Sequence, residues 1–131
     1  MPLIWLCSAC GVLGSIVTFA FGRWMESLTL LMVAMGIDYV TGVAASIKEG
    51  KGLSSAVGSW GLARKGLALL VILLAHRIDI LLDTHDVTMG AAVYFYIANE
   101  LISITENYGR LGFPLPDRIR KLIEVLKSKG S

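Results

Sequence analysis

Residues that usually build catalytic and metal sites are scarce in this chain of 131 residues, which has two cysteines and two histidines. Cys7 and Cys10 lie inside an apolar stretch, and no further cysteine or nearby histidine completes a metal or redox site around them. We therefore predict that they are two small buried residues. The sequence also shows no nucleophile paired with a base, no glycine loop for phosphate and no cluster of metal ligands. We expect neither an enzyme nor a bound cofactor.

Charge is scarce as well. Only 17% of the residues are charged and the formal net charge is +2, which is too small to indicate a nucleic-acid partner. Hydrophobic residues make up 55% of the chain and the mean hydropathy is +0.69, above the usual composition of a soluble domain. This composition indicates an integral membrane protein. At this length, one compact membrane domain leaves no room for a separate soluble catalytic domain.

Four apolar segments approach or reach the length needed to cross a bilayer, whose core of about 30 Å takes about 20 helical residues. No basic region precedes the first segment, so we expect a retained helix rather than a cleaved signal peptide. We predict an all-α integral membrane protein with four transmembrane helices and a short C-terminal amphipathic helix. The expected crossings are residues 3–22, 28–47, 67–82 and 87–105, within a membrane domain of residues 1–110.

Asp38 lies near the middle of the second apolar segment, where a lone carboxylate is costly and needs a polar partner. Gly42 follows it on the same helix face, as expected where another helix approaches closely. Glu100 is a second deeply placed carboxyl group, with Ser103 on its face. We also expect His76 to pair with Asp79 one turn away. The residues predicted to face other helices or a lumen are Asp38, Gly42, His76, Asp79, Asn99 and Glu100.

Three roles for these polar residues stay open. They can hold helices together, within one chain or between copies, because a polar group in hydrocarbon gains by meeting a partner. They can line a water-filled opening in a homo-oligomer. They can also relay protons, since ionisable residues inside a bilayer are often functional.

Residues 48–66 form the longest predicted loop and hold four basic residues against one acidic residue. By the positive-inside rule this loop is cytoplasmic. The middle of the loop, residues 53–62, is mildly apolar and includes Trp60, so we expect part of it to lie in the interface as a short helix. The turn at residues 83–86 is acidic, as an external loop is allowed to be.

Pro114 and Pro116 interrupt the chain before a last predicted helix at residues 117–129, within a tail of residues 111–131. Its apolar positions follow the i, i+3, i+4, i+7 pattern of one helix face: Ile119, Leu122, Ile123 and Leu126. The other side is basic, and we predict that it binds anionic lipid or tunes assembly: Arg118, Arg120, Lys121 and Lys127. Because the tail and the basic loop hold most of the positive charge, we expect both termini in the cytoplasm.

Several short motifs resemble the phage lysis and toxin-secretion holin family, also called phage holin family 4. They include DYVTG at residues 38–42, the Leu53, Ser54 and Ser55 segment leading to Arg64 and Lys65, and the Ala75, His76 and Asp79 set. The most specific piece is the pattern of the fourth segment with its proline-flanked exit before the basic tail: Asn99, Glu100, Ser103, Ile104, Glu106 and Asn107, followed by Gly112, Pro114, Leu115 and Pro116. The resemblance runs from about residue 37 to the end and leaves the first helix outside.

The resemblance implies a phage-encoded protein that accumulates in the bacterial cytoplasmic membrane and oligomerises into lesions at a set time of host lysis. Its functional partner would be an endolysin, or a toxin in relatives that secrete toxins, with no direct binding required. The family has no agreed catalytic residues, so the resemblance assigns none. Two alternatives stay open: a small ion- or proton-coupled transporter or channel, which would use the buried acids, and a membrane anchor subunit, which would use the basic tail.

Overall fold

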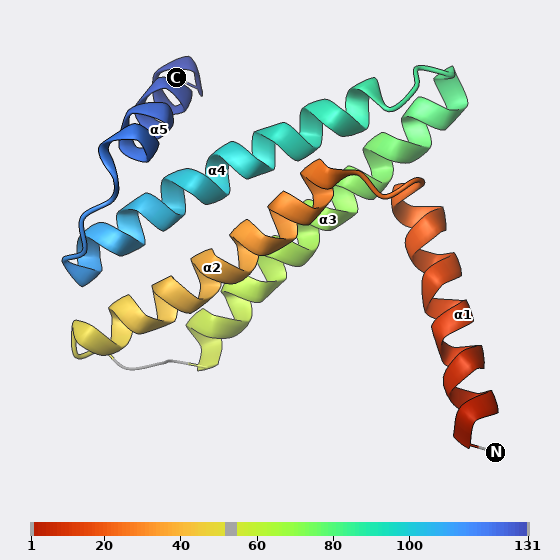
Figure 1. Ribbon diagram of the computed structural model, residues 1–131, viewed down its shortest axis with the longest axis horizontal. Helices are drawn as coiled ribbons and strands as arrows, with labels where there is room; N and C mark the ends of the chain where they lie inside the picture. The colour runs from red at the N-terminus through yellow and green to blue at the C-terminus, as the bar shows by residue number, and fades with distance from the viewer. Residues whose placement is uncertain (1, 52–54, 131) are drawn as a thin grey trace.

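The computed structural model describes residues 2–51 and 55–130, and every regular element in these ranges is a helix. The helices are α1 (Pro2–Phe21), α2 (Glu26–Lys48), α3 (Ser55–Leu82), α4 (Val87–Leu111) and α5 (Asp117–Gly130) (Figure 1). The predicted all-α fold is confirmed for this part of the chain, including a helix over the predicted residues 117–129.

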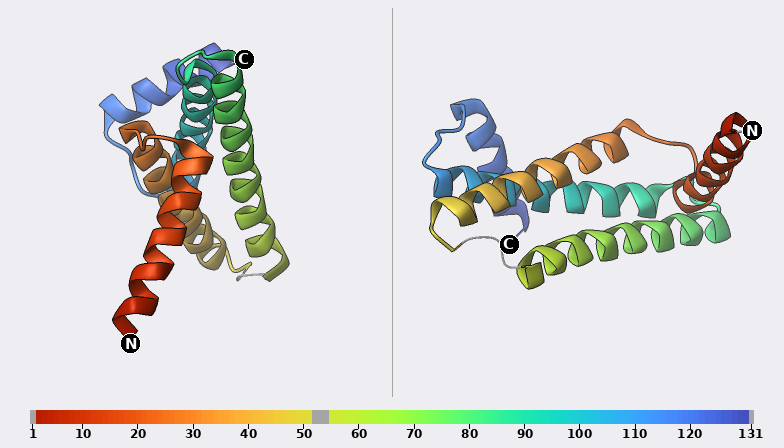
Figure 2. Two further views of the ribbon diagram at one scale, coloured as in Figure 1. Left: turned by 90° about the vertical axis from the view of Figure 1, so that its right-hand side faces the viewer. Right: turned by 90° about the horizontal axis from the view of Figure 1, so that it is seen from below.

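The helices α2, α3 and α4 form one unit in which α4 contacts both of the others. α2 and α4 run in the same direction, and α3 returns antiparallel to them (Figures 1 and 2). Apolar residues three or four apart on each helix meet between them, and because lipid is as apolar as leucine, they stabilise the unit mainly by close packing. The buried members are Leu28, Leu31 and Met35 of α2, Ala68, Ile72 and Ala75 of α3, and Met89, Val93 and Ile97 of α4.

The outer surface of this unit is also apolar. On α2, for example, an exposed row at three- and four-residue steps comprises Leu30, Val33, Ile37 and Val40. α1 leaves the unit at the turn before α2, and its start lies well away from the other helices (Figures 1 and 2). Only Ala20 of α1 is buried. An apolar helix with so little protein around it is suited to lipid on most of its faces.

Among the residues that the structure describes, three helices are found long and apolar enough to cross a membrane: α1, α2 and α4. The predicted crossing at residues 67–82 lies in α3, whose 28 residues would span about 42 Å at a rise of 1.5 Å per residue. α3 carries Arg64, Lys65, Arg77 and Asp79.

The helices extend beyond their predicted ends on the side of the basic loop. α3 begins at Ser55, so the long loop predicted at residues 48–66 is wrong, and residues 55–62 are the first turns of α3 rather than a separate interfacial helix. Residues 53 and 54 lie outside the described ranges. α4 continues to Leu111 and ends at Gly112, whose φ of 81° is the left-handed conformation that closes many helices. Polar contacts described below support both extensions.

Cys7 and Cys10 are free and exposed on α1. The prediction that they are buried is therefore wrong, because no described helix packs against this part of α1. In α5, Ile123 is buried whereas Ile119, Leu122 and Val125 stay exposed. The predicted basic residues Arg118, Arg120 and Lys121 are exposed, and the side chain of Lys127 lies outside the described part.

Candidate functional site

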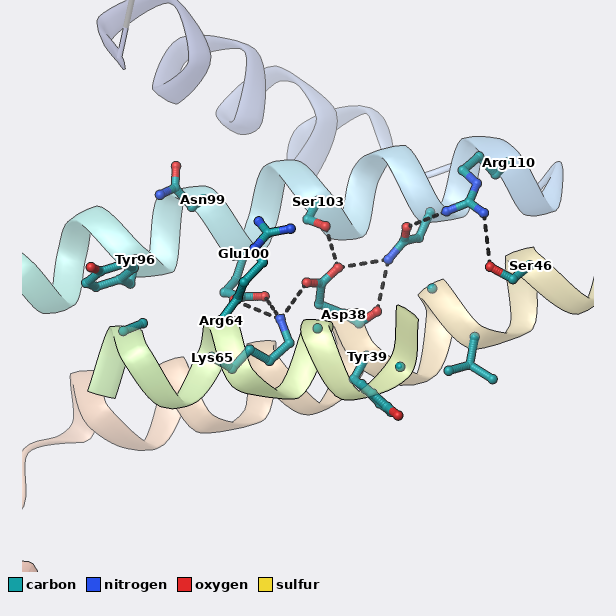
Figure 3. Close-up of a pocket in the computed structure, with 16 residues that line it drawn as sticks. Asp38, Tyr39, Ser46, Arg64, Lys65, Tyr96, Asn99, Glu100, Ser103 and Arg110 are labelled. Carbon is teal, nitrogen blue, oxygen red and sulfur yellow. Dashed lines mark hydrogen bonds and ion pairs between the residues drawn. The ribbon is translucent and has the colours of Figure 1, made fainter. Parts of the chain in front are cut away.

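A lysine from α3 joins the two buried carboxylates. Lys65 Nζ donates to Asp38 Oδ2 at 2.7 Å and to both carboxylate oxygens of Glu100 at 2.9 Å (Figure 3). The side chains are only 17%, 12% and 12% exposed for Lys65, Asp38 and Glu100 respectively. One cation therefore links α2, α3 and α4 at the centre of the unit.

Asp38 receives further hydrogen bonds from α4. Its Oδ1 accepts from Ser103 Oγ at 2.5 Å and from Asn107 Nδ2 at 2.8 Å. Asn107 Nδ2 also lies 3.0 Å from the Asp38 carbonyl oxygen and from Thr41 Oγ1. The partner that a carboxylate needs inside a membrane is thus supplied within one chain.

The spacing of these residues explains why they meet. Glu100, Ser103 and Asn107 are three and four residues apart, so they form one row on α4, which continues to Arg110. A matching row on α2 begins with Asp38 and passes Gly42. An ideal Cβ at Gly42 would lie 3.5 Å from Asn107 Nδ2, an ordinary contact. The parallel course of α2 and α4 keeps the two rows in register.

The row of contacts ends at what we call the basic end of the unit, where α2 and α4 finish. Arg110 donates to Glu49 Oε1 at 2.7 Å, and this hydrogen bond holds the pKa of the Glu49 carboxyl below its ordinary value. Lys48 Nζ donates to the carbonyl oxygen of Leu111. A cation at the last carbonyls of a helix is stabilising, because the helix dipole is negative there.

A second polar cluster lies at the opposite end, which we call the acidic end. Asp79 is 2% exposed and accepts from the backbone amides of Thr88 at 3.1 Å and Met89 at 2.7 Å. It therefore caps the start of α4 from the end of α3. His76 Nδ1 lies 2.9 Å from Asp86 Oδ1. The prediction that Asp79 pairs with His76 is wrong, because His76 pairs with Asp86 in the turn before α4 and Asp79 pairs with the first amides of α4.

The His76 ring also fixes the exit of α1. Gly22 has a φ of 66°, and an ideal Cβ there would lie 2.5 Å from His76 Cε1. Only glycine adopts that backbone conformation without cost and leaves room for the ring. Arg77, the next residue, holds its guanidinium carbon 4.4 Å from the centre of the Phe19 ring. The contact of α1 with the unit is concentrated here.

The predicted polar residues therefore separate into three places. Asp38, Gly42 and Glu100 come together with Lys65, Ser103 and Asn107, and we call these six residues the central cluster. His76 and Asp79 lie at the acidic end. Asn99 is exposed; its side chain points away from the Asp38 carboxylate (Figure 3) and lines the cleft described below. The sequence reasoning missed Lys65, which was placed in a loop, and it missed the roles of Asn107 and Arg110. Extending the row from Glu100 by three- and four-residue steps would have found the last two.

A cleft of about 370 Å³ opens beside the central cluster between α2, α3 and α4. Gly58 and Gly61 line it on α3, where glycines leave space that side chains would fill. In the described residues, no group of three or more histidine, cysteine, aspartate or glutamate side chains could hold a metal ion. Every buried side-chain nitrogen or oxygen there has a hydrogen-bond partner. The cluster is a closed network that ties helices together.

Three apolar candidate spans and a polar network between helices define this chain as a helical membrane protein. Residues 15–128 match the bacteriophage holin family, and the chain belongs to that family, which consists of non-enzymatic membrane proteins.

Related proteins match over most of their length. A probable holin of Bacillus phage phi105 is 39% identical over 110 residues, covering 84% of this chain and 80% of the relative. An uncharacterized protein of Halalkalibacterium halodurans is 40% identical over 125 residues, covering 92% of each chain. An uncharacterized protein of Clostridium perfringens, encoded in the nagH 3′ region, is 41% identical over 118 residues, covering 89% of each. No solved structure matches this chain.

Proposed function

We propose that this protein is a holin that oligomerises in the bacterial cytoplasmic membrane and forms lesions through which an endolysin, or a toxin, leaves the cell at a set time. The observation that carries this proposal is the family match over residues 15–128, which covers all of α2, α3 and α4. The likeness to a relative named probable holin supports it. The holin family resemblance found in the sequence motifs points to the same function.

The dimensions of the chain favour an assembly of many copies. The cleft of about 370 Å³ is far smaller than a folded enzyme, so one copy cannot enclose a path for such cargo. The central cluster holds α2, α3 and α4 as one unit whose outer surface is apolar. We infer that these units accumulate individually in lipid and form a lesion only when many of them associate.

We further propose four crossings with both termini in the cytoplasm. The end of α2, the start of α3 and the start of the tail lie at the same end of the unit (Figure 1), and they carry basic residues, so the positive-inside rule places this end in the cytoplasm. α3 would be the fourth crossing, with its charges paired to α2 and α4 or lying near the interfaces. Single cysteines test this arrangement: His85→Cys and Arg118→Cys, in a Cys7→Ser, Cys10→Ser background, should be labelled from opposite sides. Labelling of both from one side would contradict it.

The tail is proposed to bind anionic lipid at the cytoplasmic surface. Its exposed basic residues Arg118, Arg120 and Lys121 accompany exposed apolar residues of the same helix, a combination that favours a lipid interface. Ending the chain at Pro114 should alter the onset of lysis and leave insertion intact. If the shortened protein never enters the membrane, the tail has a structural role instead.

The function is tested by inducing the protein in bacteria with and without a cytoplasmic muralytic endolysin that has no export signal. We expect lysis of the culture only when both proteins are present, and loss of viability with the holin alone. Lys65→Met at an equal membrane level is the matched control, because it removes the cation that joins the helices. Well-inserted protein that never releases the endolysin would refute the proposal, and flux of a small solute in growing cells would favour a transporter.

A further inference from the structure

One stripe of α4 runs beside the row that faces α2; Ala92 in it also packs against the apolar core, and Asn99 also lines the cleft. Ala92, Phe95, Asn99, Ile102 and Glu106 recur at steps of three and four residues, the spacing of the contact positions in a coiled coil. Phe95, Asn99 and Glu106 are exposed, and the other two are half-buried. We call these five residues the Asn99 stripe. Although α5 contacts α4, it leaves Asn99 and Glu106 exposed.

Asn99 is the unusual member of the stripe. It lies at the midpoint of α4 (Val87–Leu111), and its side chain is directed away from Asp38 and Lys65 (Figure 3). Its amide has no hydrogen-bond partner among the described residues. The exposed hydroxyls of Ser15 and Thr18 on α1, by contrast, donate to carbonyls of their own helix.

An unpaired amide at the middle of a membrane-spanning helix is unfavourable. Moving such a group from water to a medium that cannot hydrogen-bond costs about 4 to 8 kcal/mol. The carboxamide both donates and accepts hydrogen bonds, so a second asparagine is a matching partner. In a two-fold contact the same residue of each copy meets its counterpart. A polar residue within an otherwise apolar seam also fixes the register of the two helices.

We propose that the Asn99 stripe is the surface through which two copies of this chain associate, with the Asn99 amides hydrogen-bonded to each other between two α4 helices. Phe95 and Ile102 pack on either side of that contact. Glu106 lies toward the basic end, where water can hydrate like charges. The inference rests on the proposed function, because lesion formation requires copies to meet, and it names the surface of the first contact.

The test measures association directly in membranes. In a Cys7→Ser, Cys10→Ser background, Phe95→Cys places a thiol on the stripe and Val40→Cys places one on the lipid-facing row of α2; the native side chains are 60% and 67% exposed. Mild oxidation should crosslink copies through Phe95→Cys and much less through Val40→Cys. Ile102→Cys measures crosslinking at a second position of the stripe while Phe95 keeps its native side chain.

Adding Asn99→Leu should weaken association about threefold to tenfold, whereas Asn99→Gln should retain most of it. Equal crosslinking from Phe95→Cys, Ile102→Cys and Val40→Cys would overturn the proposal. So would an unchanged yield with Asn99→Leu at equal membrane levels, which would mean that water in the cleft already satisfies the amide. Crosslinking as expected in cells that keep their endolysin inside would instead refute the proposed function and leave this interface standing.

Discussion

Replacing Lys65 with methionine should destabilise the three-helix unit by about 3 kcal/mol. The substitution keeps an apolar stem of similar length and removes the ammonium that both carboxylates share. Because Asp38 and Glu100 accept from the same nitrogen at 2.7 and 2.9 Å, their oxygens lie within about 6 Å of each other, and at an effective dielectric constant of about 20 they repel by about 3 kcal/mol. Removing one partner of a buried ion pair typically costs about 3 to 5 kcal/mol.

The free energy of unfolding can be measured by titrating the purified protein in mixed micelles with a denaturing detergent. Lys51→Met is the matched control. The Lys51 side chain is 73% exposed and its ion pair with Glu49 is long, at 3.7 Å, so its loss should cost less than about 1 kcal/mol. Adding Asp38→Asn to Lys65→Met removes one of the repelling charges and should recover much of the lost stability. Equal stability of Lys65→Met and Lys51→Met, or no recovery in the double variant, would refute this account of the cluster.

The same titration tests three further substitutions. Gly22→Ala should lower the free energy of unfolding by at least about 1 to 2 kcal/mol, the cost of the left-handed conformation, because the new Cβ must also displace His76. Gly42→Ala should be neutral or stabilising by up to about 1 kcal/mol, since its Cβ meets Asn107 at an ordinary distance; a larger loss would show that α2 and α4 approach more closely. Asp79→Ala should cost about 1 to 2 kcal/mol, because the first amides of α4 lose their cap, and a neutral result would show that water replaces it.

Much of the fold follows from hydropathy and spacing along the chain. The apolar segments matched the interiors of α1 to α4, and the tail pattern matched α5. The need of Asp38 for a polar partner was also predictable, since a carboxylate in hydrocarbon has few alternatives. Those conclusions depend on short-range patterns and on the solvent, both of which are present in the sequence itself.

The identity of the partner was not predictable in the same way. Lys65 lies in a segment rich in glycine and basic residues, which is typical of a loop, and its two carboxylate partners come from other helices, α2 and α4. The pairing of His76 with Asp86, rather than Asp79, likewise depends on how α4 begins after the turn. Such contacts join residues distant along the chain or across a turn, so local spacing favours the wrong partner.

The central claim is that this chain forms membrane lesions by self-association, and membrane potential followed in single cells after induction tests it most directly. Because association of many copies depends steeply on their amount, we expect the potential to stay constant through a lag while protein accumulates and then to collapse abruptly in each cell. Asn99→Leu should lengthen the lag at an equal rate of synthesis. A gradual loss of potential in proportion to the inserted protein, or no loss in cells with abundant inserted protein, would contradict the claim.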